Sequence, residues 1–366
     1  MTTLDTLDYL ILLELLNNPT ITVTELALKL NSSRPTVTKY LKKLKEKGII
    51  RNTIANIYPE RLNLIIVDVL AFVSSYENLL LLEKACDEHP YTYYRSRIYG
   101  GKFGLFMIFY TPIGSISNID EFFKKLLKNN IINDYQVYES NGISYSSSSD
   151  ISRFNIEKSK WDFSWEKWIS TIEQEKDKML VENIDPIDLK VIKRTHFEIL
   201  RMLTENAAIK QKEISKKLNL SKTEAHRQYN FVLEKFIKEI RQTFNRNNFL
   251  LTETFLIIAH NVPEKKLAKI NNKMRNDPPP FYGSLLILKD NKFRFWVNMS
   301  IDQAGTFIFS LFEYFNDIEV YTLNTRKGGS VQYHFYPENF DFDSKNWKDS
   351  KNYMIKKPLE RLNLKI

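Results

Sequence analysis

The chain repeats itself at an offset of 188 residues, so that Leu12 aligns with Leu200 and Asn18 with Asn206 without a gap. Further identical pairs at this offset are Glu25 with Glu213, Leu30 with Leu218, Ser33 with Ser221, Glu46 with Glu234 and Ile49 with Ile237. A repeat of this length corresponds to whole domains and not to a solenoid unit. The fold must therefore be built twice, and function depends on what one unit does and on what its fusion to a second unit adds.

The composition is that of a globular protein. With 366 residues, of which 43% are hydrophobic, the chain can form about two to four domains with ordinary cores. No apolar run approaches the length that spans a bilayer, and Cys86, the single cysteine, excludes an intrachain disulfide. The sequence favours a cytoplasmic protein without a membrane partner.

The excess of positive charge is concentrated in one segment. The formal net charge is +9, and between Asn31 and Arg51 seven basic residues stand against one acid. A basic segment of this kind predicts a polyanionic partner.

Three helices are predicted at the start of the chain. Apolar residues recur at helical spacing over 7–16, a second short helix is predicted at 25–30, and a third begins at Ser33, its cap, and ends at Gly48. Two short helices joined by a tight turn, the second of them basic, are typical of a helix-turn-helix whose second helix enters the DNA major groove.

The third helix has side chains that can read or hold DNA. Arginine pairs with guanine, threonine contacts a thymine methyl or a phosphate, and lysine binds the backbone. The predicted DNA contacts in the first unit are Ser32, Ser33, Arg34, Thr36, Thr38, Lys39, Lys42, Lys43 and Arg51. For Lys42 and Lys43, which lie further along the helix, simple solvation is an equal alternative.

The residues after this helix carry a resemblance to a known family. Residues 48–57 are predicted to form a β wing, and they are followed by Pro59-Glu60-Arg61-Leu62-Asn63-Leu64. This hexapeptide, together with 25–30, 33–37 and 41–50, resembles the Lrp/AsnC family of prokaryotic transcription regulators, here of archaeal style. In that family a similar segment, with glycine at the position of Asn63, links a winged helix-turn-helix to a βαββαβ regulatory domain. Asparagine tolerates the left-handed backbone that glycine adopts there.

The rest of the first unit fits that βαββαβ order, which is a ferredoxin-like sandwich. Strands are predicted at 65–73, 89–98, 103–110 and 135–139, and helices at 79–86 and 119–127. In the family this domain binds small effectors, often amino acids, and pairs subunits through its sheet, so the resemblance also implies self-association through the sheets.

The loop from Tyr99 to Gly104 differs from the family pattern, because glycine stands where an acidic residue is expected. Without a carboxylate the loop lacks a partner for the amino group of an amino acid. We interpret Gly100-Gly101 as a hairpin turn and do not expect a small-molecule effector.

The second unit keeps the core pattern, with strands predicted at 254–259, 281–288, 293–299 and 318–325 and helices at 264–274 and 305–315. Its predicted DNA contacts are Ser221, Lys222, Thr223, His226, Arg227 and Gln228. Between Asn219 and Arg246 six basic residues stand against three acids. We therefore expect this helix to bind DNA more weakly, with a purely structural role as the alternative.

Each unit ends in an aromatic extension, Trp161-Asp162-Phe163 with Trp168 and Phe340-Asp341-Phe342 with Trp347, which we interpret as a packed strand or clasp. A flexible break is predicted at 146–150 and a charged helical linker at 173–182. The predicted fold class is α+β. The predicted domains are a winged helix-turn-helix at 1–58, a ferredoxin-like domain at 59–145, an extension and linker at 146–185, a second winged helix-turn-helix at 186–248, a second ferredoxin-like domain at 249–335 and a C-terminal extension at 336–366.

No pattern indicates catalysis. The five histidines, at 89, 196, 226, 260 and 334, are scattered without metal-ligand spacing, and the sequence holds no nucleotide-binding or nucleophile motif. The sequence predicts no catalytic residue, no metal site and no cofactor.

These observations predict a sequence-specific transcription regulator that binds double-stranded DNA as a single-chain pseudo-dimer, in the cytoplasm and associated with the nucleoid. Because the two recognition helices differ, the DNA site should be asymmetric. One alternative is a non-catalytic module that binds protein or RNA in a transcription or replication assembly, and another is a small-molecule sensor. Duplex DNA binding differs from the first alternative in its steep dependence on salt.

Overall fold

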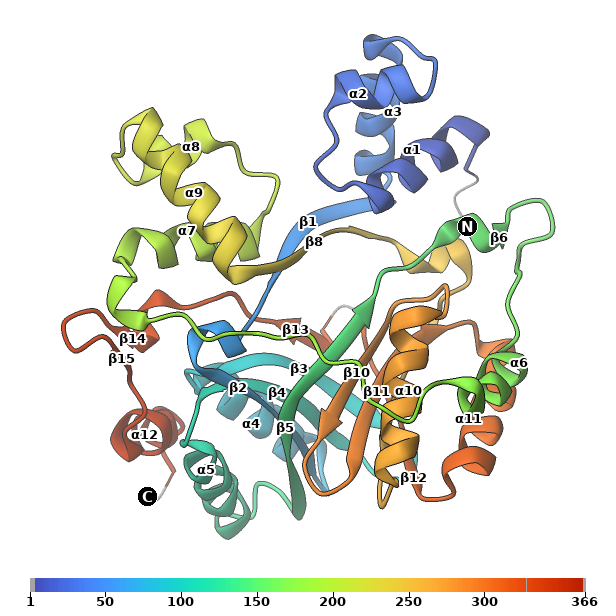
Figure 1. Cartoon of the computed structure of the whole chain (residues 1–366). Coiled ribbons are helices and arrows are strands. Elements are labelled where there is room, and N and C mark those ends of the chain that lie inside the picture. The colour runs from blue at the N-terminus through green and yellow to red at the C-terminus, as the bar shows by residue number, and fades with distance from the viewer. Residues whose placement is uncertain (1–3, 327, 365–366) are drawn as a thin grey trace.

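The computed structural model describes residues 4–326 and 328–364. The outer ends of the first and last predicted domains, at 1–3 and 365–366, lie outside this part of the chain, as does residue 327. Two helical domains lie on the same side of a β-barrel, which carries further helices on its outside (Figure 1). The α+β class predicted from the sequence is confirmed.

The first unit contains both parts that the repeat predicts. Its helical domain consists of α1 (Thr6–Asn17), α2 (Val23–Lys29) and α3 (Arg34–Glu46), followed by strand β1 (Ile50–Ile57). Its ferredoxin-like domain consists of β2 (Leu64–Phe72), α4 (Tyr76–Glu88), β3 (Thr92–Tyr99), β4 (Gly104–Pro112), α5 (Ile116–Lys128) and β5 (Asp134–Ser147). The extension after it contains β6 (Phe154–Asn155), β7 (Lys160–Trp161) and α6 (Trp165–Ser170).

The second unit repeats this order. Its helical domain consists of α7 (Arg194–Glu205), α8 (Gln211–Lys217) and α9 (Lys222–Phe236), followed by strand β8 (Ile237–Phe244). The ferredoxin-like domain consists of β9 (Glu253–Ala259), α10 (Glu264–Asn276), β10 (Gly283–Leu288), β11 (Lys292–Met299), α11 (Ile301–Phe315), β12 (Ile318–Leu323) and β13 (Ser330–Gln332). The last extension contains β14 (Phe340–Asp341), β15 (Asn346–Trp347) and α12 (Lys357–Arg361).

Local sequence signals set several of these boundaries. Ser33 caps α3 by accepting a hydrogen bond from the backbone N–H of Thr36 at 3.2 Å, and Gly48 leaves the helix with a φ of +64°. Asn63 takes the expected left-handed conformation, with a φ of 56°. Leu250 has a φ of 59° at the corresponding turn of the second unit, so the turn geometry is retained there even without a favourable residue.

The strands of both ferredoxin-like domains form one barrel. The order is β12-β9-β11-β10-β5-β2-β4-β3, and β12 also pairs with β3, so the sheet closes on itself through two junctions between the units. Successive side chains point to opposite faces. Val67 and Val69 pack under the outer helices, whereas Ile66, Leu70 and Leu286 fill the barrel interior. Each sheet therefore covers the inner face of the other within a single chain.

Strands β1 and β8 form a separate antiparallel ribbon, with Ile54 opposite Arg241 and Ala55 opposite Ile240. The β segment predicted after α3 is thus not a hairpin of its own, because it pairs with the corresponding strand of the second unit. A lone strand would leave an unpaired edge, and the repeat supplies a matching partner. The ribbon joins the two helical domains above the barrel (Figure 1).

Each helical domain packs against the ferredoxin-like domain of the other unit. One hydrophobic cluster joins Ile11 and Leu12 of α1 to Phe255 and Phe281, and a second joins Phe197 of α7 to the first ferredoxin-like domain. This crosswise packing makes the two halves of the chain one continuous structure.

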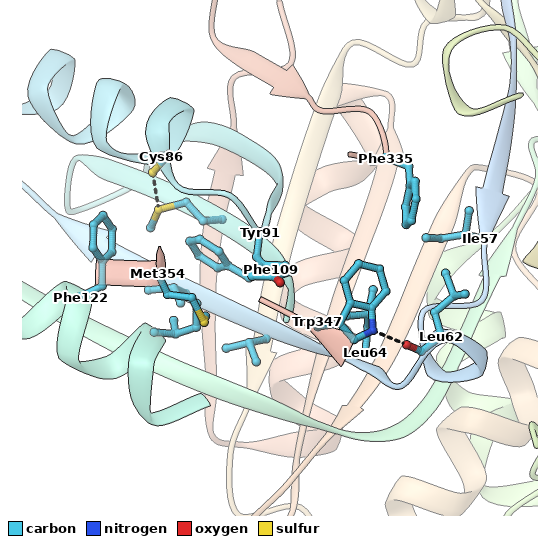
Figure 2. Packing of buried hydrophobic residues seen from close by; sticks show 14 of the residues in the cluster. Ile57, Leu62, Leu64, Cys86, Tyr91, Phe109, Phe122, Phe335, Trp347 and Met354 are labelled. Carbon is cyan, nitrogen blue, oxygen red and sulfur yellow. Dashed lines mark hydrogen bonds between the residues drawn. The ribbon is translucent and has the colours of Figure 1, made fainter. Parts of the chain in front are cut away.

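The aromatic extensions secure the crossing. The indole N–H of Trp161 donates to the carbonyl of Phe249 at 2.7 Å, and that of Trp347 donates to the carbonyl of Leu62 at 2.7 Å. Figure 2 shows Trp347 and Phe335 beside Leu62 in the core of the first unit. The interpretation of these extensions as packed clasps is confirmed.

Two expectations about connections are wrong. Residues 173–182 do not form a helical linker, because a short turn ends at Gln174 and the chain continues without helix. The side chain of Asn272 donates to the carbonyls of Lys176 and Lys178 and so replaces the helical partners of these groups. Residues 146–147 are not a flexible break, since Ser146 and Ser147 continue β5 opposite β10.

Candidate nucleic-acid interface and central cavity

The first recognition helix, α3, presents a free polar face. Arg34, Thr38 and Lys39 are exposed, and neither Arg34 nor Lys39 has an ionic partner among the described residues. Ser33 and Thr36 share a hydrogen bond at 2.8 Å that fixes the start of the helix, and Ser32 is half-buried in the turn before it. Such an unoccupied face is available to bases and phosphates.

Two predicted contacts of the first unit are used elsewhere. The Lys43 ammonium group donates to Asp5 at 2.9 Å and to Asp8 at 2.6 Å, and these hydrogen bonds raise its pKa above the ordinary value. Lys43 therefore ties α3 to α1. Arg51 stands on β1 and lines a cavity below the ribbon. Lys42 stays exposed and lies 3.7 Å from Glu46, an exposed pair of little energetic weight.

The second recognition helix, α9, has its polar face occupied by its own residues. Ser221 caps it, accepting a hydrogen bond from the backbone N–H of Glu224 at 3.1 Å, while Lys222 and Thr223 are exposed. The Glu224 carboxylate accepts hydrogen bonds from Arg227 and from Gln228, and these lower the pKa of Glu224 to about 2.

Two further predicted readers of α9 are also engaged. Gln228 is only 4% exposed, so in this conformation it does not face a groove. His226 contacts the side chain of Gln211 at 3.0 Å and that of Asn230 at 3.0 Å. At the offset of 188 residues Glu224 aligns with Thr36. In α9 a carboxylate thus stands where α3 has a hydroxyl. It adds a negative charge to the exposed polar face that would contact DNA, which we call the reading face, and it pairs with Arg227.

The same offset shows how differently the two helical domains are held together. Asp8 of α1 aligns with His196 of α7, and Lys43 of α3 aligns with Phe231 of α9. The first pair of helices is joined by the ion pair described above, and the second by stacking of His196 on Phe231 with ring centroids 4.4 Å apart. Burial lowers the pKa of His196 to about 4.

A cavity of about 890 Å³ lies between the β1–β8 ribbon and the mouth of the barrel. Both units line it. From the ribbon and the turn after it come Arg51, Arg241 and Arg246, from β3 come Tyr93 and Tyr94, and from the second unit come Tyr282, Arg294 and Trp296. We refer to it as the central cavity.

The central cavity is basic and aromatic. Arg294 is buried and paired with Asp68 inside the barrel at 2.9 Å, and Arg241 lies 3.5 Å from Glu239. Arg246 has no ionic partner among the described residues. Burial lowers its pKa, and the neighbouring Arg241 and Arg51 act in the same direction.

Sequence reasoning missed this cavity. In the sequence, Arg241 and Arg246 contribute only to the charge around α9, and Tyr282 and Trp296 fall within predicted strands. No local signal brings them together, since their proximity results from barrel closure and from the pairing of β1 with β8.

Other kinds of site receive no support from the described residues. They contain no group of three or more histidine, cysteine, aspartate or glutamate residues that could hold a metal ion. Over the same part of the chain, no helix has the length and apolar character needed to cross a bilayer. Cys86 is buried in the core of the first unit, where its thiol contacts the sulfur of Met107 (Figure 2).

Comparison with known proteins agrees with this architecture. The family model described as "Winged helix-turn-helix DNA-binding" matches residues 4–51 and again residues 185–234. A comparison with curated proteins finds no match. The chain therefore has two winged helix-turn-helix DNA-binding domains in tandem.

The solved structures extend the likeness over the whole chain. The siroheme decarboxylase NirDL is 12% identical, with 98% of this chain and 100% of that chain covered and a TM-score of 0.55. The same protein in complex with an iron-uroporphyrin III analogue is 13% identical over 92% of this chain and 96% of that chain, again with a TM-score of 0.55. An AsnC family transcriptional regulator from Agrobacterium tumefaciens is 24% identical over 38% of this chain and 90% of that chain, with a TM-score of 0.32. The chain is a tandem protein of Lrp/AsnC-like fold, a winged helix-turn-helix plus a ferredoxin-like domain, built twice.

Proposed function

We propose that the protein is a transcription regulator that binds double-stranded DNA as a single-chain pseudo-dimer. The observation that carries the proposal is the placement of α3 and α9 on the same side of the molecule, with their domains joined by the β1–β8 ribbon (Figure 1). In a dimeric helix-turn-helix regulator two such helices enter successive major grooves about 34 Å apart. The crosswise packing supplies within one chain what two subunits supply in a dimer. In this role the protein would lie in the cytoplasm, associated with the nucleoid.

The DNA site of this regulator would be asymmetric. Arg34 and Lys39 on α3 are free to read bases and hold phosphates, whereas Arg227 on α9 is neutralised by Glu224 at 2.7 Å. We therefore assign base reading chiefly to α3 and weaker, backbone-directed contacts to α9 through Lys222 and Thr223. The two ferredoxin-like sheets already cover each other, so pairing through the sheets would be intramolecular and the active species a monomer.

Selection of bound sequences from a random duplex pool, followed by hydroxyl-radical footprinting, tests this proposal. The expected result is one well-defined half-site and one degenerate half-site on the same face of the duplex. Binding should weaken steeply between low and moderate salt as counterions are released. Selection of perfect palindromes would contradict the asymmetry. Equal binding of duplex DNA and of RNA, without salt dependence, would instead favour a non-catalytic module that binds protein or RNA.

A second candidate function is chemistry on a tetrapyrrole, as the name of NirDL suggests. Two observations favour it, namely the likeness over almost the whole of both chains and a central cavity lined by arginines and aromatic rings. Loss of carbon dioxide from a carboxylate side chain leaves an electron pair on carbon, which a nearby acid must protonate.

The residues that line the central cavity fit binding better than this proton transfer. Histidine is absent from the described lining, and the hydroxyl groups there belong to tyrosine, serine and threonine. The one carboxyl group of the described lining is that of Glu60, and burial raises its pKa. Burial raises the pKa of Tyr94 to about 12, which makes it a weak acid. Because a single carboxyl group stands among several arginines, we propose a non-enzymatic protein, with Glu60 as the acid to examine if the protein proves to be an enzyme. Incubation with siroheme under anaerobic conditions, followed by mass spectrometry of the products, tests whether the protein is an enzyme. Loss of carbon dioxide above the level seen without protein would show that it is.

A further inference from the structure

The central cavity has the properties of a site for a sizeable organic ligand. It lies at the mouth of a barrel, a place where small-molecule sites recur, and its volume of about 890 Å³ falls in the usual range for such sites. The ribbon that forms its wall and the barrel that forms its floor each combine strands of both units, so the cavity exists only in the assembled chain.

The charges of the cavity predict an anionic ligand. Arg51 and Arg246 carry no ionic partner among the described residues, and Arg241 has only the 3.5 Å contact with Glu239. Arg246 is near enough to Arg241 and Arg51 for both to lower its pKa in addition to burial, so its charge is costly to hold there without a counter-charge. Guanidinium groups bind carboxylates and phosphates through paired hydrogen bonds.

The aromatic residues predict a flat ring in the same ligand. Tyr93 and Tyr110 are stacked with centroids 4.0 Å apart. Tyr94 and Trp296 lie 4.8 Å apart, and Trp296 meets Tyr282 edge-on at 6.1 Å. The indole N–H of Trp296 is buried and has no hydrogen-bond partner among the described residues. A conjugated ring could stack on this surface and accept that hydrogen bond.

We propose that the central cavity binds a small organic polyanion with a flat conjugated ring, and that the bound ligand controls how the two recognition helices are presented to DNA. The second half of this statement rests on the proposed regulator function. The ligand would join Arg51, Arg241 and Arg246, on and just after the ribbon, to Tyr94 and Trp296 of the barrel. Because the ribbon connects both helical domains, fixing it against the barrel restricts how the two domains move relative to each other. By linkage, if the ligand changes the affinity for DNA by a given factor, bound DNA must change the affinity for the ligand by the same factor.

Calorimetric titration of the full chain without DNA tests the binding site by itself. The probes are uroporphyrin III, a flat polycarboxylate, ATP, a flat base with phosphates, and citrate, a polycarboxylate without a ring. We expect saturable binding of uroporphyrin III or ATP at one site per chain, with citrate at least about tenfold weaker. Preference between the two flat probes identifies carboxylate or phosphate as the anionic group. No saturable binding of either flat probe, or equal binding of citrate, overturns the proposed ligand class.

Two variants with the same change of charge locate the site. Arg246→Gln should weaken binding of the flat probe at least about tenfold, whereas Arg153→Gln, at an exposed position outside the cavity, should leave it unchanged. Arg246→Gln should also keep or raise the melting temperature of the free protein, because it relieves repulsion, while a structural arginine would lower it when replaced. Equal binding by the two variants overturns the assignment of the cavity.

The regulatory half of the proposal is tested by measuring DNA affinity with and without the flat probe. The expected result is a change of at least about fivefold that is absent in Arg246→Gln. Arg34→Ala serves as the control, since it should lose DNA affinity and still bind the probe. Failure of the regulator function would therefore be visible separately from failure of the ligand site. A probe that binds while DNA affinity stays unchanged overturns the coupling.

Discussion

The two helix-turn-helix domains have the same helices and different surfaces. In the first, the ion pair between Lys43 and Asp8 lies inside the domain, at 2.6 Å, and the reading face of α3 is left free. In the second, the inner contact is the aromatic stack of His196 on Phe231, and the charged residues Glu224 and Arg227 pair with each other on the reading face of α9. The same fold thus holds an ionic contact in one domain and an aromatic contact in the other, and on α9 the arginine is paired with Glu224 while Lys222 stays exposed. A duplicated domain can thus keep its fold while its binding chemistry diverges.

The largest expected difference between the domains is in DNA affinity. Arg34→Ala combined with Lys39→Ala should weaken binding to the selected duplex about 100-fold, because one bidentate base contact contributes roughly 1–3 kcal/mol and a phosphate contact adds to it. The matched change in α9, Lys222→Ala with Arg227→Ala, should cost only about threefold. Fluorescence anisotropy at fixed salt measures both. Equal losses would mean that the two helices read DNA alike.

The next largest effect concerns stability. Lys43→Met should lower the free energy of unfolding, because it leaves the buried Asp8 carboxylate without its cation, although solvent screening at the partly exposed Lys43 reduces the loss. DNA affinity per folded molecule should change by less than about threefold. Urea denaturation and anisotropy on the same sample separate the two effects. A large loss of affinity with unchanged stability would place Lys43 at the DNA, as the sequence suggested.

Acid should destabilise the second domain through His196. Its pKa is lowered from an ordinary 6.5 to about 4 in the folded chain, so below pH 6.5 the unfolded chain binds a proton that the folded chain does not. The contribution of the neutral histidine is therefore fully present above pH 6.5 and is lost as pH falls toward 4, with a slope of up to about 1.4 kcal/mol per pH unit. Urea denaturation at several pH values measures this slope. In His196→Gln the slope between pH 4 and 6.5 should be smaller, by an amount that corresponds to about one proton fewer taken up on unfolding.

The smallest predicted effect is a gain of function. Glu224→Thr makes α9 resemble α3 by replacing the carboxylate with the residue found at Thr36, which frees Arg227 and removes a negative charge. DNA affinity should rise about threefold to fivefold at low salt, and the rise should shrink at high salt. Glu234→Thr, an exposed acid near the end of the same helix, is the matched control and should have a smaller effect. No gain from Glu224→Thr would show that this carboxylate does not limit binding.

The sequence alone predicted what depends on local chemistry. The Ser33 cap, the left-handed Asn63 turn and the order of helices and strands follow from residues that are close in the chain. Contacts between segments that are distant in the sequence were not predicted. The crossing of the two units, the use of Lys43 by Asp8 and the gathering of Arg51, Arg241 and Trp296 around one cavity result from contacts between distant segments. A repeat reveals that two similar surfaces exist, but it does not reveal that they meet.

A footprint of the protein on its selected duplex, compared with footprints of the two double variants, shows whether one chain binds DNA asymmetrically. We expect Arg34→Ala with Lys39→Ala to remove sequence-specific protection, whereas Lys222→Ala with Arg227→Ala should shorten the protected region at one end and leave the defined half-site intact. Symmetric protection that either pair of substitutions abolishes to the same degree would contradict an asymmetric single-chain pseudo-dimer.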